Sequence, residues 1–406
     1  MWEEFPPIST AEWEAAISAD LKGADYTKKL VWQTEEGIAV KPYYRREDLP
    51  GTTGQARFIG EWKTRKLREI PGDAVRGDLL HEQGATSVQE IGYALAASAG
   101  KRTSFVFAVG SNYFMEIAKL RAARQLWARI SKEPMVIWSR TSLANKSLYD
   151  PSANLMRCTT EAMSAIFGGC DYLVVEAARF AQHLAESLPR VLAEESHLDQ
   201  VSDPGGGSYY IETLTASIAV EGWKVYQAGL AGRDAVITAA RTAKEKAVAQ
   251  RKRTLVGVNN YPDLSETLPA GAQLPDSRWR MATPFEEIRM CVEKSGKRPL
   301  VLLLQRGDLK MRMARANFCL NFFGCAGFEV RNSDKREPAD LVVLCSSDAE
   351  YLALAKEIVP QSKAPVVVAG NPKEHIEALR AAGVKDFIYL GVNAVEVLSR
   401  WQEALA

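Results

Sequence analysis

The sequence is poor in histidine and has no excess of charge of either sign. Its 406 residues include 4 histidines, and 51 lysines and arginines stand against 50 acidic residues, which leaves a net charge of +1. A chain without a basic excess has no overall field to attract nucleic acid or an anionic membrane surface. We therefore expect neither nucleic-acid binding nor membrane binding.

Long apolar runs are also absent. The longest, such as 300–304 and 366–369, fall far short of the ~20 residues that cross a bilayer. The first ten residues carry acids and prolines, where a signal peptide would carry basic residues and then an apolar stretch. These features predict a cytoplasmic protein.

The cysteines and histidines form no pattern typical of a disulfide framework or a zinc site. None of the six cysteines belongs to a C-x-x-C motif, and His183, His197 and His375 lie away from other metal-ligating residues. We expect reduced thiols that lie mostly in cores, and no bound metal.

Residues 1–70 predict an N-terminal arm. Ser9 or Thr10 is placed to cap a short helix with apolar residues at helical spacing. Two apolar segments then flank Glu35-Glu36-Gly37, which is typical of a β-hairpin whose glycine supplies a positive φ.

Residues 71–213 predict an α/β fold with about four strand-helix units. The strands are expected at 74–80, 103–110, 134–141 and 171–176, and continuous apolar strands suit a parallel sheet that is buried on both faces. Such units resemble half of a TIM-like (β/α) barrel, which has eight strands when closed. The open edges and inner face need a cover from the arm or from another chain.

The remainder predicts a helical connector and a second α/β unit. Residues 214–290 contain long helices and then a proline-rich linker. Residues 291–406 alternate five short strands with helices, which is typical of a flavodoxin-like doubly wound domain.

Five collinear blocks of this chain are more specific than any short motif. They are 104–124 (SFVFAVGSNYFMEIAKLRAAR), 140–151 (RTSLANKSLYDP), 154–163, 203–212 (DPGGGSYYIE) and 251–259. Together they resemble the methylmalonyl-CoA mutase family. The resemblance implies a barrel that threads an acyl-CoA and a C-terminal domain that binds adenosylcobalamin. Heterodimeric members pair a catalytic large chain with a non-catalytic small chain, and the segments 145–151 and 20–26 resemble the small chain.

The cobalamin motif of active members is Asp-x-His-x-x-Gly after the first C-terminal strand. The matching residues here are Asp308, Lys310 and Met313, so only the aspartate is retained. A lysine ammonium lacks the lone pair that cobalt needs. The resemblance therefore implies a degenerate site. Ser346 and Ser347 match a cofactor-contacting loop, but we expect them to act as helix caps.

Active members also place a histidine on the thioester carbonyl. By the same resemblance that position is Leu79, which donates no hydrogen bond. His81 is two residues later and would share its face on a strand, but we expect it to be structural.

The other charged or glycine-rich groups favour plain structural interpretations. We expect a turn at 205–207, no nucleic-acid role for 251–253, and a solvated helix face for Lys119, Arg121 and Arg124, with a CoA-phosphate contact as the alternative. The arm leads directly into what resembles the fifth strand of the family barrel, so about four units are missing.

These observations predict a non-catalytic small subunit of an adenosylcobalamin-dependent methylmalonyl-CoA mutase. Its partner would be the large subunit in a heterodimer, which would hold the adenosylcobalamin, and no cofactor is expected on this chain. The alternatives are an autonomous acyl-CoA mutase or cobalamin-binding enzyme with unusual ligands, and a structural homo-oligomer, a homodimer included. The acyl-CoA that the assembly rearranges stays open.

Overall fold

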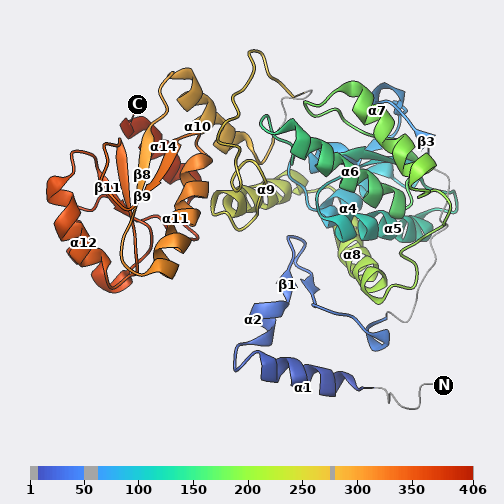
Figure 1. Ribbon diagram of the computed structural model, residues 1–406. Coiled ribbons are helices and arrows are strands. Elements are labelled where there is room, and N and C mark those ends of the chain that lie inside the picture. Colours follow the sequence, from blue (N-terminus) through green and yellow to red (C-terminus); the bar gives the residue numbers. More distant parts are fainter. Residues whose placement is uncertain (1–7, 50–62, 275–278, 406) are drawn as a thin grey trace.

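The computed structural model describes residues 8–49, 63–274 and 279–405. Figure 1 shows an arm, an α/β unit with helices α4, α5, α6 and α8, and a second α/β unit with β8, β9 and β11. Helix α9 (Arg233–Ala249) lies between the two units in this view.

The arm begins with helix α1 (Thr10–Asp20), which Ser9 caps in a capping box with Glu12. A short helix, α2 (Tyr26–Leu30), follows. Strands β1 (Trp32–Gln33) and β2 (Ala39–Val40) then pair in an antiparallel hairpin. Gly37 has a φ of +77° in its turn, which confirms the predicted hairpin. No residue of α1 is buried, and Figure 1 shows this helix standing away from both sheets.

The first unit contains a five-stranded sheet in which every strand pairs in parallel. Its order is β3-β7-β6-β5-β4. The strands are β3 (Lys63–Thr64), β4 (Val75–Arg76), β5 (Ser104–Val109), β6 (Val136–Thr141) and β7 (Tyr172–Val174). The parallel strands and their helices fit the TIM-like arrangement expected from the sequence.

Strand β3 covers one of the open edges that a half barrel leaves. It comes from the end of the arm and pairs with β7, so the arm covers one edge of the sheet. On the inner face, Val106, Trp138 and Val174 are buried in a small cluster to which Ile70 adds a partly buried side chain. The arm therefore supplies part of the cover that the sequence requires.

Helices form the outer layer of this sheet. They are α4 (Ser87–Ser98), α5 (Tyr113–Ile130), α6 (Pro151–Phe167), α7 (Gln182–Arg190) and α8 (Tyr209–Ala228). Helix α7 continues through Pro189 into a π-helical turn, Val191–Glu195. A Cβ on Gly92 of α4 would meet the Val225 Cβ of α8 at 2.5 Å, so α4 and α8 approach closely.

The prediction of a strand over 74–80 is wrong in its second half. After β4 the chain turns into helix α3 (Gly77–His81), which buries Gly77, Asp78 and Leu80. Leu79 and His81 therefore do not share a strand face. A short apolar stretch does not distinguish a strand from one helical turn, and here the tertiary contacts chose the helix.

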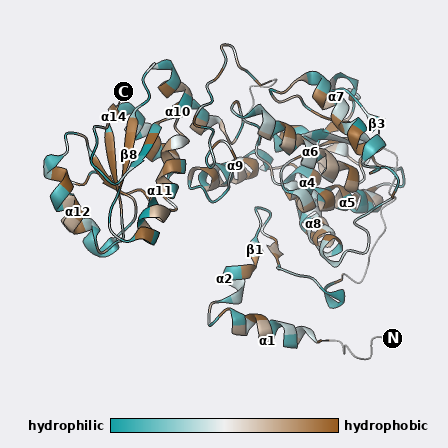
Figure 2. Cartoon of the chain, viewed as in Figure 1, coloured by the Kyte–Doolittle hydropathy of each residue, from teal (hydrophilic) through white to brown (hydrophobic). Residues whose placement is uncertain are grey.

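The second unit has a four-stranded parallel sheet in the order β11-β10-β8-β9. Its strands are β8 (Leu300–Gln305), β9 (Glu329–Ser333), β10 (Leu341–Cys345) and β11 (Val366–Val368). The predicted fifth strand near 386–390 is reduced to one bridge from Phe387 to Val368. Figure 2 shows hydrophobic strands in this sheet around β8, and β8, β10 and β11 are largely buried, in keeping with burial on both faces, whereas the edge strand β9 is polar and mostly exposed.

Helices also surround this second sheet. They are α10 (Thr283–Lys294), α11 (Leu309–Gly324), α12 (Tyr351–Ile358), α13 (Ile376–Ala381) and α14 (Ala394–Leu405). Residues from α10 and from the segment that follows α9 belong to the same hydrophobic cluster as β8 and α11. The proline-rich segment is thus anchored on the second unit.

Among the described residues, no helix is both long enough and apolar enough to cross a membrane. The six cysteines are free thiols; five are buried, and Cys291 is exposed. The expectation that most lie in cores is confirmed.

Candidate functional site

A cavity of about 520 Å³ lies where β5 and β6 end. In (β/α) folds this edge of the sheet carries the functional groups. Gly110 and Asn112 line it after β5, Asn145 lines it after β6, and His81 approaches from α3. The hairpin contributes Trp32 and three neighbours, and α9 contributes Lys244. Residues of the barrel, of the arm, and of α9 with the segment after it therefore line the cavity together.

A buried ion cluster lies behind the part of the cavity that Glu116 lines. The Lys119 ammonium lies 2.8 Å from Glu90 Oε2 and 2.5 Å from Glu116 Oε2, and it also donates to the Ala108 carbonyl at 2.5 Å. Burial alone would raise the pKa of Glu90, but Lys119 and the contact with His81 lower it to about 2. The cluster thus holds two carboxylates against one ammonium.

His81 connects this cluster to the loop after β6. Its Nε2 lies 3.0 Å from Ser142 Oγ, and its Nδ1 lies 3.5 Å from Glu90 Oε2. Ser142 is fully buried, so this chain of contacts ends inside the protein. Leu79 is half-buried and is absent from the cavity lining. The structure therefore places His81, and not the predicted thioester position, at the cavity.

Ion pairs join the hairpin to α9 and to the segment after α9 beside the cavity. Glu35 pairs with Arg253 and lies 3.6 Å from the Lys244 ammonium. Glu36 accepts a hydrogen bond from the backbone N–H of Ser87, in the first turn of α4, at 3.4 Å. Burial lowers the pKa of Lys244, whose ammonium also donates to the Ala85 carbonyl at 2.8 Å. Two of the basic residues that line the cavity, Lys244 and Arg253, are therefore paired with the arm.

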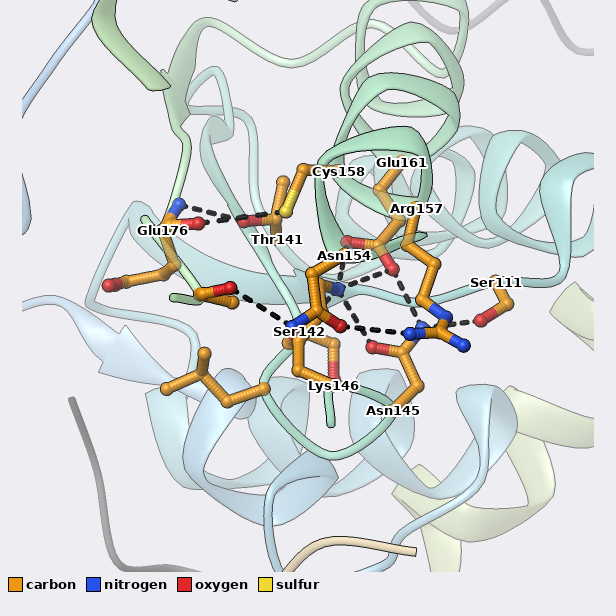
Figure 3. Close-up of polar contacts among 12 residues, drawn as sticks. Ser111, Thr141, Ser142, Asn145, Lys146, Asn154, Arg157, Cys158, Glu161 and Glu176 are labelled. Atoms are coloured by element: carbon orange, nitrogen blue, oxygen red, sulfur yellow. Dashed lines mark hydrogen bonds and ion pairs between the residues drawn. The ribbon is translucent and has the colours of Figure 1, made fainter. Parts of the chain in front are cut away.

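The loop after β6 is held by a buried polar network (Figure 3). The Lys146 ammonium binds both Glu161 oxygens, at 2.7 and 2.8 Å, and both side chains are fully buried. Asn145 donates to Glu161 at 2.7 Å and also to Ser111. Burial raises the pKa of Glu161 despite these partners. Asn145, Lys146 and Glu161 are buried, so these motif residues fix the loop through bonds to one another.

The predicted solvated face of α5 is wrong. Lys119, Arg121 and Arg124 are all buried. Arg121 pairs with Asp203 and with Glu212 at 2.6 Å, and Arg124 pairs with Asp171 at 2.8 Å. Opposite charges three residues apart on one helix, such as Glu116 and Lys119, are typical of a solvated face, so the sequence carried no signal of this burial. Residues 205–207 form a turn, as expected, and Gly207 has a φ of +80°.

The residues of the degenerate cobalamin motif lie at the start of α11. Asp308 caps this helix by accepting from the Met311 N–H at 2.8 Å. Lys310 is exposed, and 51% of the Met313 surface is accessible. Among the described residues, no group of histidine, cysteine and carboxylate side chains is arranged to hold a metal ion.

The prediction that Ser346 and Ser347 cap a helix is wrong. Helix α12 begins later, at Tyr351, and no side chain caps it. Both hydroxyls instead donate to the Glu350 carboxylate at 2.6 Å. Sequence reasoning missed Glu350 because the two serines and the following acids fit an ordinary cap pattern.

Comparisons with known proteins agree with this architecture. The family model described as methylmalonyl-CoA mutase matches residues 53–294. A methylmalonyl-CoA mutase small subunit from Porphyromonas gingivalis is 30% identical over 607 aligned positions, which cover 99% of this chain and 98% of that protein. Because this chain has 406 residues, at least 201 of those 607 positions hold a residue of the relative alone. The chain is therefore shorter than this relative by residues that lie between its matched ends.

Two further relatives carry similar names. A probable methylmalonyl-CoA mutase small subunit from Mycobacterium tuberculosis is 32% identical, and one from Streptomyces virginiae is 30% identical. Each alignment covers 85% of this chain and 65% of the relative. The chain therefore spans slightly less than two thirds of the length of these two relatives.

Proposed function

This chain belongs to the methylmalonyl-CoA mutase family, and on that premise we propose that it is a non-catalytic small subunit of an adenosylcobalamin-dependent mutase. The observation that carries the proposal is an exposed lysine, Lys310, where active members have the histidine that binds cobalt. In this proposal a large subunit holds the cofactor and isomerises methylmalonyl-CoA and succinyl-CoA, while this chain stabilises the heterodimer.

The residues at the degenerate motif do not fit adenosylcobalamin. A protonated lysine offers cobalt no lone pair. Met313 adds an exposed side chain where the family motif has glycine, and the Glu350 carboxylate accepts the hydroxyl hydrogen bonds of Ser346 and Ser347 in the matching loop. The strand order β11-β10-β8-β9 supports a flavodoxin-like C-terminal domain, and within the proposal this domain serves as a structural module.

The barrel supports the same conclusion. The five-stranded sheet represents a partial (β/α) barrel, which lacks the wall that would enclose an acyl-CoA arm. Leu79 stands at the thioester-histidine position and donates no hydrogen bond. His81 makes its contacts with Ser142 and Glu90 instead.

The arm is the part of the chain best suited to a partner. Helix α1 has no buried residue, although Trp13 stacks on Tyr43 at 5.2 Å and lies 5.5 Å from the Arg45 guanidinium. This small aromatic cluster gives the arm a defined surface without a core of its own, and aromatic residues with arginine are typical anchors at interfaces. We therefore assign the arm to the contact with the large subunit. Free thiols suit the cytoplasmic location that is part of this proposal.

The test is to mix the purified chain with adenosylcobalamin and methylmalonyl-CoA. We expect no base-off change in the visible spectrum and no succinyl-CoA, whereas addition of a large mutase subunit restores turnover and gives a 1:1 complex in sedimentation. Turnover by this chain alone would contradict the proposal and favour an autonomous enzyme. A stable homo-oligomer that ignores the large subunit would favour a structural role.

A further inference from the structure

The strand order of the second sheet reverses between β8 and β10, and the place between the loops that follow these two strands is called the switch-point crevice below. From β8 the chain passes to β9 on one side and then to β10 on the other, so β8 and β10 are neighbours whose connections diverge. In open α/β sheets, ligands bind at such a switch point, beyond the carboxyl ends of the strands. The loops here are 306–308 after β8 and 346–350 after β10.

A single carboxylate oxygen accepts the hydrogen bonds of four donor groups in this crevice. Glu350 Oε2 accepts hydrogen bonds from the Ser346 and Ser347 hydroxyls, each at 2.6 Å. The same atom accepts from the backbone N–H groups of Ser347 at 3.2 Å and Asp308 at 3.3 Å. Four donors from two loops thus converge on a single carboxylate oxygen, as they would on the oxygen of a bound anion.

The surrounding backbone is shaped for this carboxylate. Gly307 has a φ of +72°, and a Cβ at this position would overlap the Glu350 carboxylate. Hydrogen bonds from Ser346 and Ser347, followed by those from the backbone, lower the pKa of Glu350 to about 2. The neighbouring Asp348 is paired with Arg315 at 3.1 Å and takes no part in the four contacts. The crevice thus has the geometry of an oxyanion site, and the oxyanion that it holds is the Glu350 carboxylate of the chain itself.

We propose that the switch-point crevice is an anion-binding site that the protein fills with its own Glu350. The carboxylate links the loop after β8 to the loop after β10. It takes the place that the oxygen of an external anion would occupy. When Glu350 is removed, the same four donors accept an external oxyanion of the phosphate class. This inference rests on the hydrogen bonds alone and is independent of the proposed function.

The experiment compares wild type with Glu350→Ala and Glu350→Gln in the full chain. Glu357→Ala is the matched control, because it removes an exposed carboxylate from the same helix. Melting temperatures are measured in increasing inorganic phosphate, with chloride at equal ionic strength as the reference. We expect Glu350→Ala to melt several degrees lower than wild type and to recover with phosphate in a saturable manner. Wild type and Glu357→Ala should show no saturable gain.

Hydrogen exchange provides the local readout. The Asp308 and Ser347 amides should exchange at least tenfold faster in Glu350→Ala, and phosphate should restore their protection. Glu350→Gln keeps the shape of the side chain but loses its charge, so it should exchange at an intermediate rate. The proposal is overturned if phosphate leaves Glu350→Ala unchanged in both measurements, or if these amides stay protected without Glu350. Neither readout involves a partner chain, so its failure leaves the proposed function unaffected.

Discussion

At the scale of single residues, the barrel is distinguished by charges that it has buried. Lys119 has no exposed surface, and its ammonium neutralises one of the two carboxylates beside it. Its long apolar neighbours on α5 concealed this role in the sequence, because a charged residue between them resembles a solvated face. Burial and partner identity became visible only when Glu90 was brought from α4 to the same point.

Removing the ammonium should be costly. In Lys119→Met, Glu90 and Glu116 would stay buried without their partner, and breaking a buried pair costs ~3–5 kcal/mol. We expect a loss of that size in urea denaturation. Lys132→Met removes an exposed lysine and should change the free energy of unfolding by less than ~0.5 kcal/mol. Equal, small effects of both substitutions would contradict the ion cluster.

The pKa of Glu90 gives a pH dependence with a defined sign. The folded-state pKa of about 2 lies below the ordinary glutamate value of 4.5, so the folded protein binds this proton less readily than the unfolded chain. The stabilising contribution is therefore complete above about pH 4.5 and is lost as the pH falls toward 2. In Glu90→Gln this component of the pH dependence should be missing from acid-unfolding curves. An identical acid limb in both proteins would argue against it.

At the scale of elements, helix packing against the parallel sheet depends on close approach. The central strands β5 and β6 were predicted from continuous apolar runs, and their bounds agree with the structure within one or two residues. The short elements β3, α2 and α3 were missed or misassigned, since two to five residues carry no period.

The contact between α4 and α8 offers a test at this scale. Gly92→Ala would place a methyl group against Val225, and overpacking of this kind costs ~1–3 kcal/mol. We expect a lower melting temperature and an unchanged far-ultraviolet circular dichroism spectrum. Ala97→Ser, on the exposed side of α4, should be nearly neutral. A neutral Gly92→Ala would mean that the two helices separate easily.

At the scale of the whole molecule, the arm divides into an anchored part and a projecting part. Ile38 and Val40 of the hairpin are buried in the main core of the first unit. Helix α1 buries nothing in this chain. A deletion of residues 1–45 would therefore remove core residues together with the proposed contact with the large subunit.

A shorter deletion separates these two effects. Removal of residues 1–24 spares α2 and the hairpin and should leave the melting temperature within about two degrees of wild type. We expect it to weaken binding to a large mutase subunit at least tenfold by isothermal titration calorimetry, because Trp13 is lost. The deletion 1–45 should weaken binding and also lower the melting temperature. Undiminished binding by both truncated chains would exclude the arm as the contact.

The sequence by itself determined the α/β class, the family, the hairpin and the absence of a cobalt-binding histidine at position 310. These follow from local periodicity, turn chemistry and residue identity, which need no knowledge of distant partners. Only the tertiary structure decided that the α5 cations are buried, that β3 covers an edge of the half barrel, and that Glu350 takes the donors at the switch point. Each of these depends on contacts between residues remote along the chain or on a choice among several local hydrogen-bond partners. The free energies that settle such contacts arise from burial and geometry, which the order of residues does not display.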